Sequence, residues 1–332
     1  MRVGDRPMRC LVLTVLVAAI ASMPSVAQVG ERTAPLRGLD EYVQVPESNP
    51  LTPAKVTLGR RLFFDPLLSA DRTISCASCH HPELAFSDTT ARSRGVRGQE
   101  TTRNVPSILN RAYGASFFWD GRARSLEEAV VQPIENPREM ALPLSILLDR
   151  LRQDSAYRHL FGEVFRDSVT APNVARSLAS YLRVLRSGDS PADRYMAGER
   201  SALSVEAARG LEVFFGKANC VACHAGPLFT DESFHNTGVS PADTGRGLVT
   251  HRAEDRGAFK VPSLRNVAMT APYMHDGSIA TLDSVVEFYD HGGGLSGRSD
   301  PELRPLRLTN EEKRELLAFL RSLTASSFVH QP

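Results

Sequence analysis

A motif of the form Cys-x-x-Cys-His occurs twice in this chain, and no other feature constrains the fold as strongly. The copies are Cys76–His80 and Cys220–His224. In such a motif, two thiols on one helical turn add across the vinyl groups of a haem, and the next residue places an imidazole beneath the iron. The two copies therefore predict two covalently bound haem c groups, with a fold built around each of them.

The use of cysteine supports this interpretation. Four of the five cysteines lie in the two motifs, and the fifth, Cys10, lies near the N-terminus. Four cysteines in an exported protein would ordinarily form two disulfides, and a Cys-x-x-Cys pair can also bind zinc or act as a redox dithiol. The shared spacing and the histidine after each pair favour haem over these alternatives. The predicted attachment residues are Cys76, Cys79, Cys220 and Cys223, and the predicted iron ligands are His80 and His224.

The N-terminus has the pattern of a secretory signal peptide over residues 1–27. Three arginines precede an apolar run over residues 11–21, and small residues end at Ala27, where a signal peptidase would cut. The apolar run is too short to span a bilayer comfortably, although an uncleaved anchor is the alternative. Cleavage would reduce 39 basic residues to 36 and 38 acidic residues to 37, a net charge of about −1. We therefore expect a periplasmic protein with no membrane span after cleavage, no nucleic-acid partner, and redox partners recognised by local patches of charge.

The motifs belong to a longer internal duplication. In each half a glycine stands four residues before a pair of phenylalanines, and the serine of a Val-Pro-Ser sequence stands twelve residues before an x-Asp-Gly sequence. The repeated landmarks are Gly59, Phe63–Phe64, Val105–Ser107 and Trp119–Gly121 in the first half, and Gly210, Phe214–Phe215, Val261–Ser263 and His275–Gly277 in the second. Two copies of one haem-binding module, joined head to tail, are the simplest explanation.

Helical periodicity dominates the rest of the chain. Apolar residues recur at helical spacing over residues 53–64, 173–186, 204–215 and 309–323, and no convincing run of alternating strand residues is present. We therefore predict a mainly α fold. The predicted organisation is a signal peptide over residues 1–27, an N-terminal haem domain over residues 28–190 and a C-terminal haem domain over residues 191–332, joined near residues 187–199.

The duplication also predicts that the two iron sites differ. Leu126 aligns with Leu282, and seven residues later Pro133 falls on Tyr289. If this position lies over the open face of each haem, the first iron has no second protein ligand, because proline cannot coordinate, and the second is capped by a phenol. Alternatively, Tyr289 is an ordinary packed aromatic residue and the thioether of Met274 is the sixth ligand. Spacing alone leaves both interpretations open.

Together these landmarks resemble the bacterial dihaem cytochrome c peroxidases, and within them the MauG-like branch. The similarity runs from about Asn49 to Thr324, and its most specific stretches are Cys76–His80, Arg103–Ser107, Phe118–Arg122 and Ala271–Gly277. The resemblance implies two cytochrome c-like haem domains in tandem. It places the peroxidatic haem in the N-terminal domain, the electron-transfer haem in the C-terminal domain, and Trp119, the only tryptophan, between them.

The same resemblance implies the residues around the first haem. Pro133 and Glu139 match a distal proline and a catalytic glutamate of the family, whereas Ala129 replaces a distal glutamine. Many peroxidases carry a removable distal histidine in the loop before Arg103, but the loop over residues 95–99 contains no histidine. We therefore expect the first haem to be open to a small substrate.

The resemblance also implies a calcium ion between the domains. Its protein ligands would be the side chain of Asn104 and the carbonyl oxygens of Thr270 and Pro272, which are the hard oxygen donors that calcium prefers. At the second haem, MauG-like proteins have tyrosine where the peroxidase branch has methionine. This favours Tyr289 as the sixth ligand, with Met274 as the alternative. The histidines His159, His235 and His251 are more typical of a protein surface than of ligands.

These expectations lead to one principal function and two alternatives. The principal function is reduction of hydrogen peroxide to water with electrons from a small periplasmic cytochrome c or cupredoxin. The first alternative is a MauG-like enzyme that oxidises residues of a partner protein. The second is a dihaem electron carrier without catalysis, which an open first haem disfavours.

Overall fold

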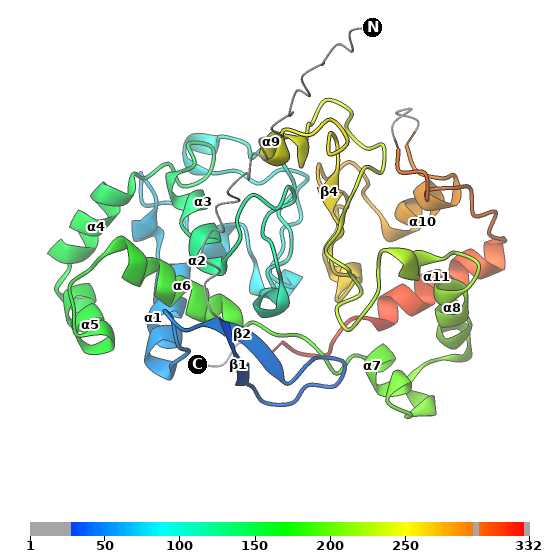
Figure 1. Ribbon diagram of the computed structural model, residues 1–332, viewed down its shortest axis with the longest axis horizontal. Coiled ribbons are helices and arrows are strands. Elements are labelled where there is room, and N and C mark those ends of the chain that lie inside the picture. The colour runs from blue at the N-terminus through cyan, green and yellow to red at the C-terminus, as the bar shows by residue number, and fades with distance from the viewer. Residues whose placement is uncertain (1–27, 295–298, 329–332) are drawn as a thin grey trace, which may run out of the picture.

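The computed structural model describes residues 28–294 and 299–328 of the chain. The predicted signal peptide, residues 1–27, lies outside this described part. The N-terminal half lies on one side of the molecule and the C-terminal half on the other (Figure 1). The described chain is rich in helices joined by long irregular segments, which confirms the predicted mainly helical character.

The helices divide between the two halves. The first half contains α1 (Pro53–Phe64), α2 (Leu126–Ala129), α3 (Gln132–Glu135), α4 (Leu144–Gln153), α5 (Ser155–Phe165) and α6 (Ala171–Val184). The second half contains α7 (Pro191–Met196), α8 (Val205–Phe215), α9 (Gly247–Thr250), α10 (Leu282–Asp290) and α11 (Asn310–Ser322). Two small antiparallel ribbons pair β1 (Gln28–Arg32) with β2 (Tyr42–Pro46), and β3 (Phe234–His235) with β4 (Phe259–Lys260). Helices α1, α6, α8 and α11 begin and end within two residues of the predicted ranges.

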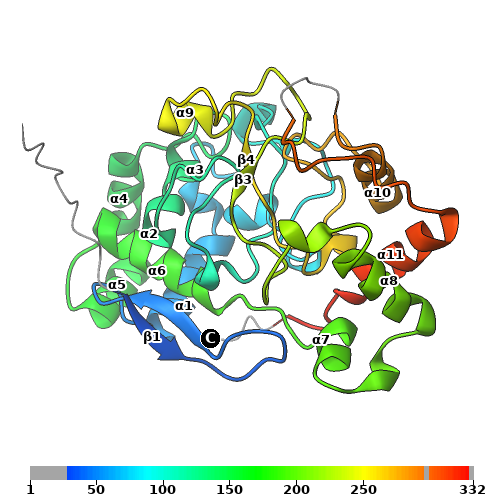
Figure 2. The same ribbon diagram turned by 45° about the vertical axis from the view of Figure 1, so that its right-hand side comes forward.

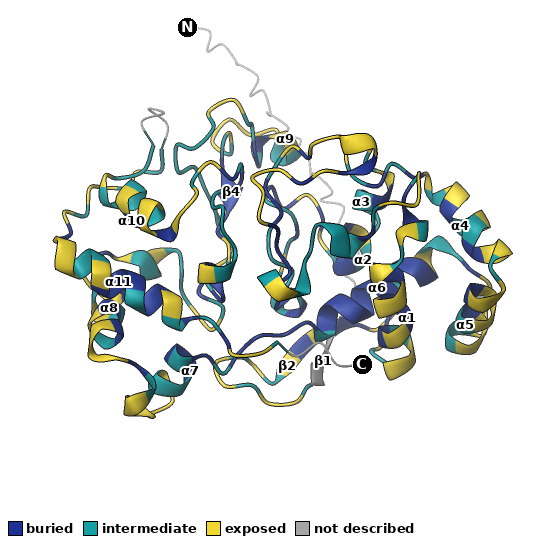
Figure 3. Cartoon of the chain, turned by 180° about the vertical axis from the view of Figure 1, so that it is seen from behind, coloured by how far each residue is buried: buried dark blue, intermediate teal, exposed yellow. Residues whose placement is uncertain are grey.

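A tight helix crossing organises the first half. Helix α1 packs against α6 at Gly59, where an added Cβ would lie only 1.9 Å from the carbonyl oxygen of Ser177. Only glycine allows the two backbones to approach so closely. Beside the crossing, the buried rings of Phe63 and Tyr181 lie with their centroids 5.2 Å apart. Helix α6 is buried along most of its length (Figure 3).

The second half repeats this crossing with different residues. Helix α8 packs against α11 at Gly210, where an added Cβ would lie 1.8 Å from the carbonyl oxygen of Glu315. The rings of Phe214 and Phe319 lie 5.1 Å apart, in the places that Phe63 and Tyr181 occupy in the first half. Each half has its own buried apolar cluster, so the duplication seen in the sequence is also a duplication of the core.

The halves meet through reciprocal backbone contacts. The amide of Asn104 donates to the carbonyl of His275 at 2.8 Å, and the amide of Lys260 donates to the carbonyl of Trp119 at 2.8 Å. Asn104 and Lys260 occupy the same place in the two repeats, each directly before a Val-Pro-Ser sequence, and so do Trp119 and His275. The repeats therefore face each other about an approximate two-fold axis, with β3 and β4 between the two sets of helices (Figure 2).

The segment between the halves is firmly held. The side chain of Ser190 caps α7, and the carboxylate of Asp193 forms a buried ion pair with Arg265 at 2.8 Å. Arg265 also donates to the carbonyl of Gly38, which lies in a turn between β1 and β2. The N-terminal segment therefore crosses the connection and binds to both halves. None of the helices described is both long and apolar enough to cross a membrane.

Candidate functional site

The first motif forms a single 3-10 turn over Cys76–Ser78. Ser75 and Ser78 close a reciprocal capping box at its start, and the amide of His80 donates to the carbonyl of Cys76 at 3.0 Å. Both thiols and the imidazole therefore project from one tight turn, which is the arrangement that attachment of a porphyrin requires.

Hydrogen bonding fixes the tautomer of His80. Its Nδ1 lies 2.9 Å from the carbonyl oxygen of Phe86. A carbonyl only accepts, so Nδ1 carries the hydrogen and Nε2 keeps its lone pair for a metal. Burial lowers the pKa of His80, although the bond to Phe86 opposes this, so the ring is held neutral as a metal ligand must be.

The second motif repeats this geometry. Cys220–Ala222 forms the same 3-10 turn, and Nδ1 of His224 lies 2.9 Å from the carbonyl oxygen of Phe229. Burial likewise lowers the pKa of His224. Nε2 of His224 is therefore also free to coordinate.

The chemistry of the thiols fits haem attachment better than the alternatives. All four are free cysteines. Burial raises the pKa to about 12 for Cys76 and Cys220 and to about 11 for Cys79 and Cys223, whereas a redox-active Cys-x-x-Cys pair needs a lowered pKa. Within residues 28–294 and 299–328, no three His, Cys, Asp or Glu side chains are grouped so as to hold a metal ion. The residues present fit two c-type haems.

The segment that carries Pro133 is broken by proline. Helix α2 ends at Ala129 and α3 begins at Gln132, with Pro133 in its first turn. Proline has no N–H, and its ring clashes with the carbonyl four residues earlier, which here belongs to Ala129. The equivalent α10 carries Tyr289 in place of proline and is continuous from Leu282 to Asp290. The aligned positions are thus equivalent in the fold but differ in chemistry.

Glu139 lies close to the first motif. Its carboxylate contributes to the raised pKa of the Cys76 and Cys79 thiols through its charge. Burial raises the pKa of Glu139 itself, and the positive charge of Arg122 and a hydrogen bond from Asn136 oppose that rise. Nδ2 of Asn136 donates to Oε1 of Glu139 at 2.6 Å. One carboxylate oxygen is therefore held by the amide.

The loop over residues 95–99, which contains no histidine, contacts the backbone of Glu139. The amide of Val96 donates to the carbonyl of Glu139 at 2.8 Å. A Cβ at Gly95 would lie 2.4 Å from that same oxygen, so glycine is needed for the loop to approach. The loop over residues 95–99 therefore packs against the segment that carries Glu139.

Tyr289 lies in the corresponding place beside the second motif. Burial raises the pKa of its phenol above the ordinary value, and the charges of Cys220 and Cys223 add to the rise. The ring is therefore close enough to the second pair of thiols to interact with them. Met274 lies in a turn closed by the amide of Gly277, with a positive φ of 71°. The sixth ligand of the second haem therefore stays a prediction, with Tyr289 preferred and Met274 as the alternative.

Trp119 lies where the two halves meet. Its indole Nε1 donates to the carbonyl of Asn104 at 2.8 Å, and its ring lies edge-on to His275 with centroids 6.4 Å apart. His275 in turn stacks on Phe259 at 3.5 Å. Trp119 therefore lies between the two halves, with its repeat counterpart His275 as its direct neighbour, and its place between two haems stays a prediction.

Asn104, one of the residues implied for calcium, is bonded to the segment that follows the other two. The backbone of Asn104 is bonded to His275, three residues after Pro272. Nδ2 of Asn104 donates to the carbonyls of Thr90 and Ala91 at 3.2 and 3.4 Å, so Oδ1 is the atom available to a cation. An amide oxygen and two backbone carbonyls form a donor set that fits calcium.

The structure adds an ionic bridge between the halves that the sequence pattern did not indicate. Arg103 donates to Asp120 of its own half at 2.7 Å and to both carboxylate oxygens of Asp243 in the second half at 2.8 and 2.9 Å. Arg122 also contacts Asp120 at 3.1 Å and lies over the ring of Phe118 at 3.6 Å. The repeat offered no signal for these pairs, because Asp243 lies in an insertion that only the second half contains.

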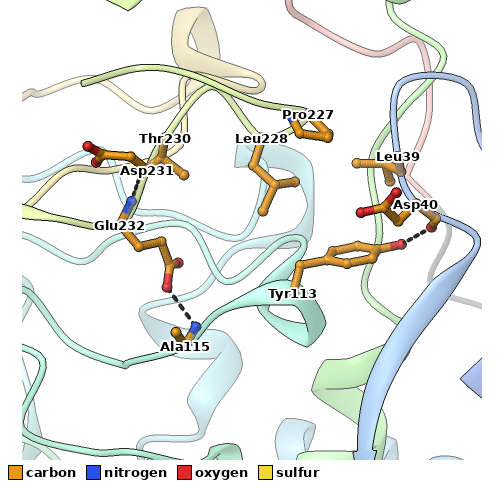
Figure 4. A pocket seen from close by; sticks show the side chains of 9 residues that line it. All are labelled: Leu39, Asp40, Tyr113, Ala115, Pro227, Leu228, Thr230, Asp231 and Glu232. Atoms are coloured by element: carbon orange, nitrogen blue, oxygen red, sulfur yellow. Dashed lines mark hydrogen bonds between the residues drawn. The ribbon is translucent and has the colours of Figure 1, made fainter. Parts of the chain in front are cut away.

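A cavity of about 280 Å³ opens between the halves close to the second motif. Its lining residues are Leu39, Asp40, Tyr113, Ala115, Pro227, Leu228, Thr230, Asp231 and Glu232 (Figure 4). Glu232 crosses it and accepts from the amide of Ala115 at 2.7 Å. Asp231 is exposed, and its amide donates to the carbonyl of Cys223 at 2.9 Å.

Comparisons with known proteins agree with the interpretation of the two motifs as haem sites. Residues 53–201 match the family model described as "Di-haem cytochrome c peroxidase". The chain is 42% identical over 290 residues to the methylamine utilization protein MauG of Methylorubrum extorquens, covering 86% of this chain and 82% of that relative. It is 36% identical over 351 residues to the cytochrome-c peroxidase IdrP1 of Denitromonas iodatirespirans, covering 95% and 93%. A crystal structure of a MauG-like protein associated with microbial copper homeostasis superposes with a TM-score of 0.80 at 32% identity, covering 93% and 96%.

The duplicated helix crossings and the two Cys-x-x-Cys-His turns define a protein of the di-haem class, with one haem site in each half. More particularly, the chain belongs to the di-haem cytochrome c peroxidase family, which includes the MauG proteins. It is therefore a haem enzyme, and its relatives include both peroxidases and MauG.

Proposed function

We propose that this protein is a periplasmic di-haem peroxidase that reduces hydrogen peroxide to water. The observation that carries the proposal is the asymmetry of the two repeats, with Pro133 at the position of Tyr289 and a partly buried Glu139 near the first motif, whereas Tyr289 lies near the second. Proline offers no ligand, so substrate can approach the first site. Tyr289 offers one, so the second site is suited to hold and pass electrons.

Haem bound at the first motif would supply the open iron and the redox chemistry, and Glu139 would move the protons. A carboxylate whose pKa is raised by burial can act as base and acid near neutral pH. Glu139 would take a proton from one peroxide oxygen and return it to the other, so that water leaves as the O–O bond breaks. Two electrons from a donor and two protons from solvent complete the reduction to two water molecules.

The remaining residues would hold this arrangement. His80 and His224 would bind iron through Nε2, and the four motif cysteines would form the thioether bonds. Trp119 would lie on the electron path between the halves, supported by its contacts with Asn104 and His275. A calcium ion bound by Asn104, Thr270 and Pro272 would brace the same region.

The proposed organisation is two cytochrome c-like domains, over residues 28–190 and 191–332. It is supported by the separate apolar clusters and by the crossings at Gly59 and Gly210. The electron donor would be a small periplasmic cytochrome c or cupredoxin. The signal peptide over residues 1–27 would deliver the chain to the periplasm.

A second function is favoured by one observation. Tyr289 lies at the second motif, and a relative named for methylamine utilization is 42% identical. A phenol ligand donates charge to iron and would favour a higher oxidation state than methionine does. The enzyme would then oxidise residues of a partner protein, using peroxide as the oxidant.

Substitution of Glu139 by glutamine tests the principal proposal. Loss of the acid–base group should lower kcat for peroxide reduction by about 10²–10⁴-fold. The assay is peroxide turnover with a reduced small cytochrome as donor. Turnover within a few-fold of wild type would show that Glu139 does not transfer protons. Turnover absent in the wild type itself would favour oxidation of a partner protein.

A further inference from the structure

A chain of polar side chains lies against the second motif, outside the site described above. His235, on β3, has Nδ1 2.5 Å from Oδ2 of Asp300 and Nε2 2.8 Å from Oγ of Ser233. The same Nε2 lies 3.7 Å from Sγ of Cys223, the thiol that attaches the second haem. His235, expected on the surface from sequence, is therefore a partly buried residue in contact with this motif.

The hydrogen bonds fix which nitrogen of His235 can change its proton. An ionised Asp300 can only accept, so Nδ1 carries a hydrogen. Nε2 is then the atom that is either bare or protonated. When it is protonated, a positive charge stands directly beside Sγ of Cys223.

Ser233 can form a hydrogen bond with Nε2 of His235 whether that nitrogen is bare or protonated. Its Oγ lies 2.7 Å from Oδ1 of Asp231 as well as 2.8 Å from Nε2 of His235. A hydroxyl has one hydrogen, so it donates either to Asp231 and accepts from a protonated ring, or to a neutral ring. In the second case Asp231 still accepts from the backbone amide of Ser233 at 2.9 Å. The chain has two complete hydrogen-bonded arrangements that differ by one proton.

The series of hydrogen-bonded side chains reaches solvent at Asp231. Asp231 is exposed and lines the cavity between the halves (Figure 4). The other end is anchored, because the amide of Asp300 donates to the carbonyl of Asn236, next to His235, at 2.8 Å. A proton from water can therefore pass through Ser233 to His235 without movement of the backbone.

We propose that Asp300, His235 and Ser233 form a proton-coupling site for the second haem, in which His235 takes up a proton when an electron arrives. Haem bound at the second motif would accept one electron from the donor, and the proton would reach His235 from solvent through Asp231 and Ser233. Each process favours the other, because the added negative and positive charges attract at short range in a weakly polar interior. The inference rests on haem attached at Cys223 and does not depend on the peroxide chemistry at the first motif.

The surrounding charges support this assignment. The carboxylates Asp231, Glu302 and Asp300 all act on the thiol of Cys223 and favour positive charge nearby. On the neighbouring strand, the residue paired with His235 is the uncharged Phe259. Lys260, next to it, is held by the carbonyl of Ser116 at 2.6 Å. His224 is the other titratable group nearby, and burial holds it neutral.

The test is the reduction potential of the second haem in the purified holoprotein, measured by spectroelectrochemistry from about pH 5 to pH 8. In the wild type the reduction potential of the second haem should fall as pH rises. The fall should be up to about 59 mV per pH unit, which corresponds to a tenfold change in the equilibrium constant for one-electron reduction. His235→Gln should remove this slope and keep the lower potential of the alkaline wild type. His159→Gln is the matched control, since His159 is an exposed residue of α5 paired with Glu163, and it should leave the slope unchanged.

If His235→Gln binds only one haem, a second variant tests the proton-coupling proposal. Asp300→Asn keeps the ring but no longer stabilises its positive charge, so the sloping region should move to lower pH. A wild type without slope, or variants of His235 or Asp300 with the wild-type profile, would overturn the proposal. Peroxide turnover is measured separately, so loss of peroxidase activity with an intact slope would count against the proposed function alone.

Discussion

Pro133 and Tyr289 hold the same place in the two repeats, yet they have opposite effects on the backbone and on the space beside it. Pro133 divides the segment into α2 and α3, whereas α10 runs unbroken through Tyr289. Glu139 follows the broken segment and lies by the first motif with one oxygen held by Asn136. Single residues therefore account for the difference between two otherwise repeated sites.

Asn136 should set the pH range of catalysis. Its amide stabilises the charged form of Glu139, so Asn136→Ala should raise the pKa of Glu139 further above its ordinary value. Because the deprotonated form is the base, the acidic limb of kcat/KM should move to higher pH. Asn136→Asp should move it further, since a second carboxylate repels the first. The check is a pH–rate profile of peroxide reduction, and a lower kcat with an unmoved limb would mean that Asn136 is only structural.

Tyr289 and Met274 can be separated by spectroscopy. If the phenol is the sixth ligand, Tyr289→Phe should change the axial ligation of the second iron, because phenylalanine has no donor atom. Met274→Leu, the matched control, should leave it unchanged. Resting-state electron paramagnetic resonance reports both irons together. The opposite pattern would make Met274 the ligand.

At the scale of elements, the helices were predictable and the contacts between them were not. Helices α1, α8 and α11 begin where local signals in the sequence place them. These signals are Pro53 in the first turn of α1 and the N-caps Ser204 and Thr309. The glycines of the two crossings were visible only as repeat landmarks. Glycine is needed at both positions because an added Cβ would lie less than 2 Å from a carbonyl oxygen of α6 or α11. This distance can be read only from the structure.

These crossings make a prediction about stability. Gly59→Ala and Gly210→Ala should each destabilise the protein by about 1–3 kcal/mol, because the added methyl forces the paired helices apart. Gly162→Ala is the control, since that exposed glycine of α5 has nothing within 4 Å of an added Cβ. It should stabilise the protein by about 0.5–1 kcal/mol through better helix propensity. Denaturant unfolding of the holoprotein measures all three, and equal effects at the three positions would contradict the packing argument.

At the scale of the whole molecule, the repeat predicted two similar halves but not how they meet. The reciprocal bonds from Asn104 and Lys260 join residues more than a hundred positions apart, and no periodicity encodes such pairs. The motifs were found from their spacing because attachment to haem demands it. Glu139 was found only through family resemblance, and the contact of His235 with Asp300 not at all, because it joins a two-residue strand to a distant loop.

The bridge from Arg103 to Asp120 and Asp243 should hold the halves together in a pH-dependent way. Burial pushes the pKa of Asp243 up, but the hydrogen bonds from Arg103 and from the amide of Gly245 outweigh it, so the pKa lies below its ordinary 3.8. A carboxylate with a lowered pKa contributes stability above the unfolded value and loses it as pH falls through the folded value. Arg103→Gln should therefore cost about 3 kcal/mol near neutral pH, because it leaves the poorly exposed Asp243 without its ion-pair partner, while Asp120 keeps its pair with Arg122.

The difference between wild type and Arg103→Gln should shrink below about pH 4, as Asp243 becomes protonated in both proteins. Arg252→Gln serves as the control, since Arg252 pairs with Glu254 on the exposed surface and its substitution should leave stability nearly unchanged. Denaturant unfolding at several pH values gives these quantities directly. A penalty for Arg103→Gln that does not change with pH would mean that the arginine acts through packing on Phe259 rather than through its charge.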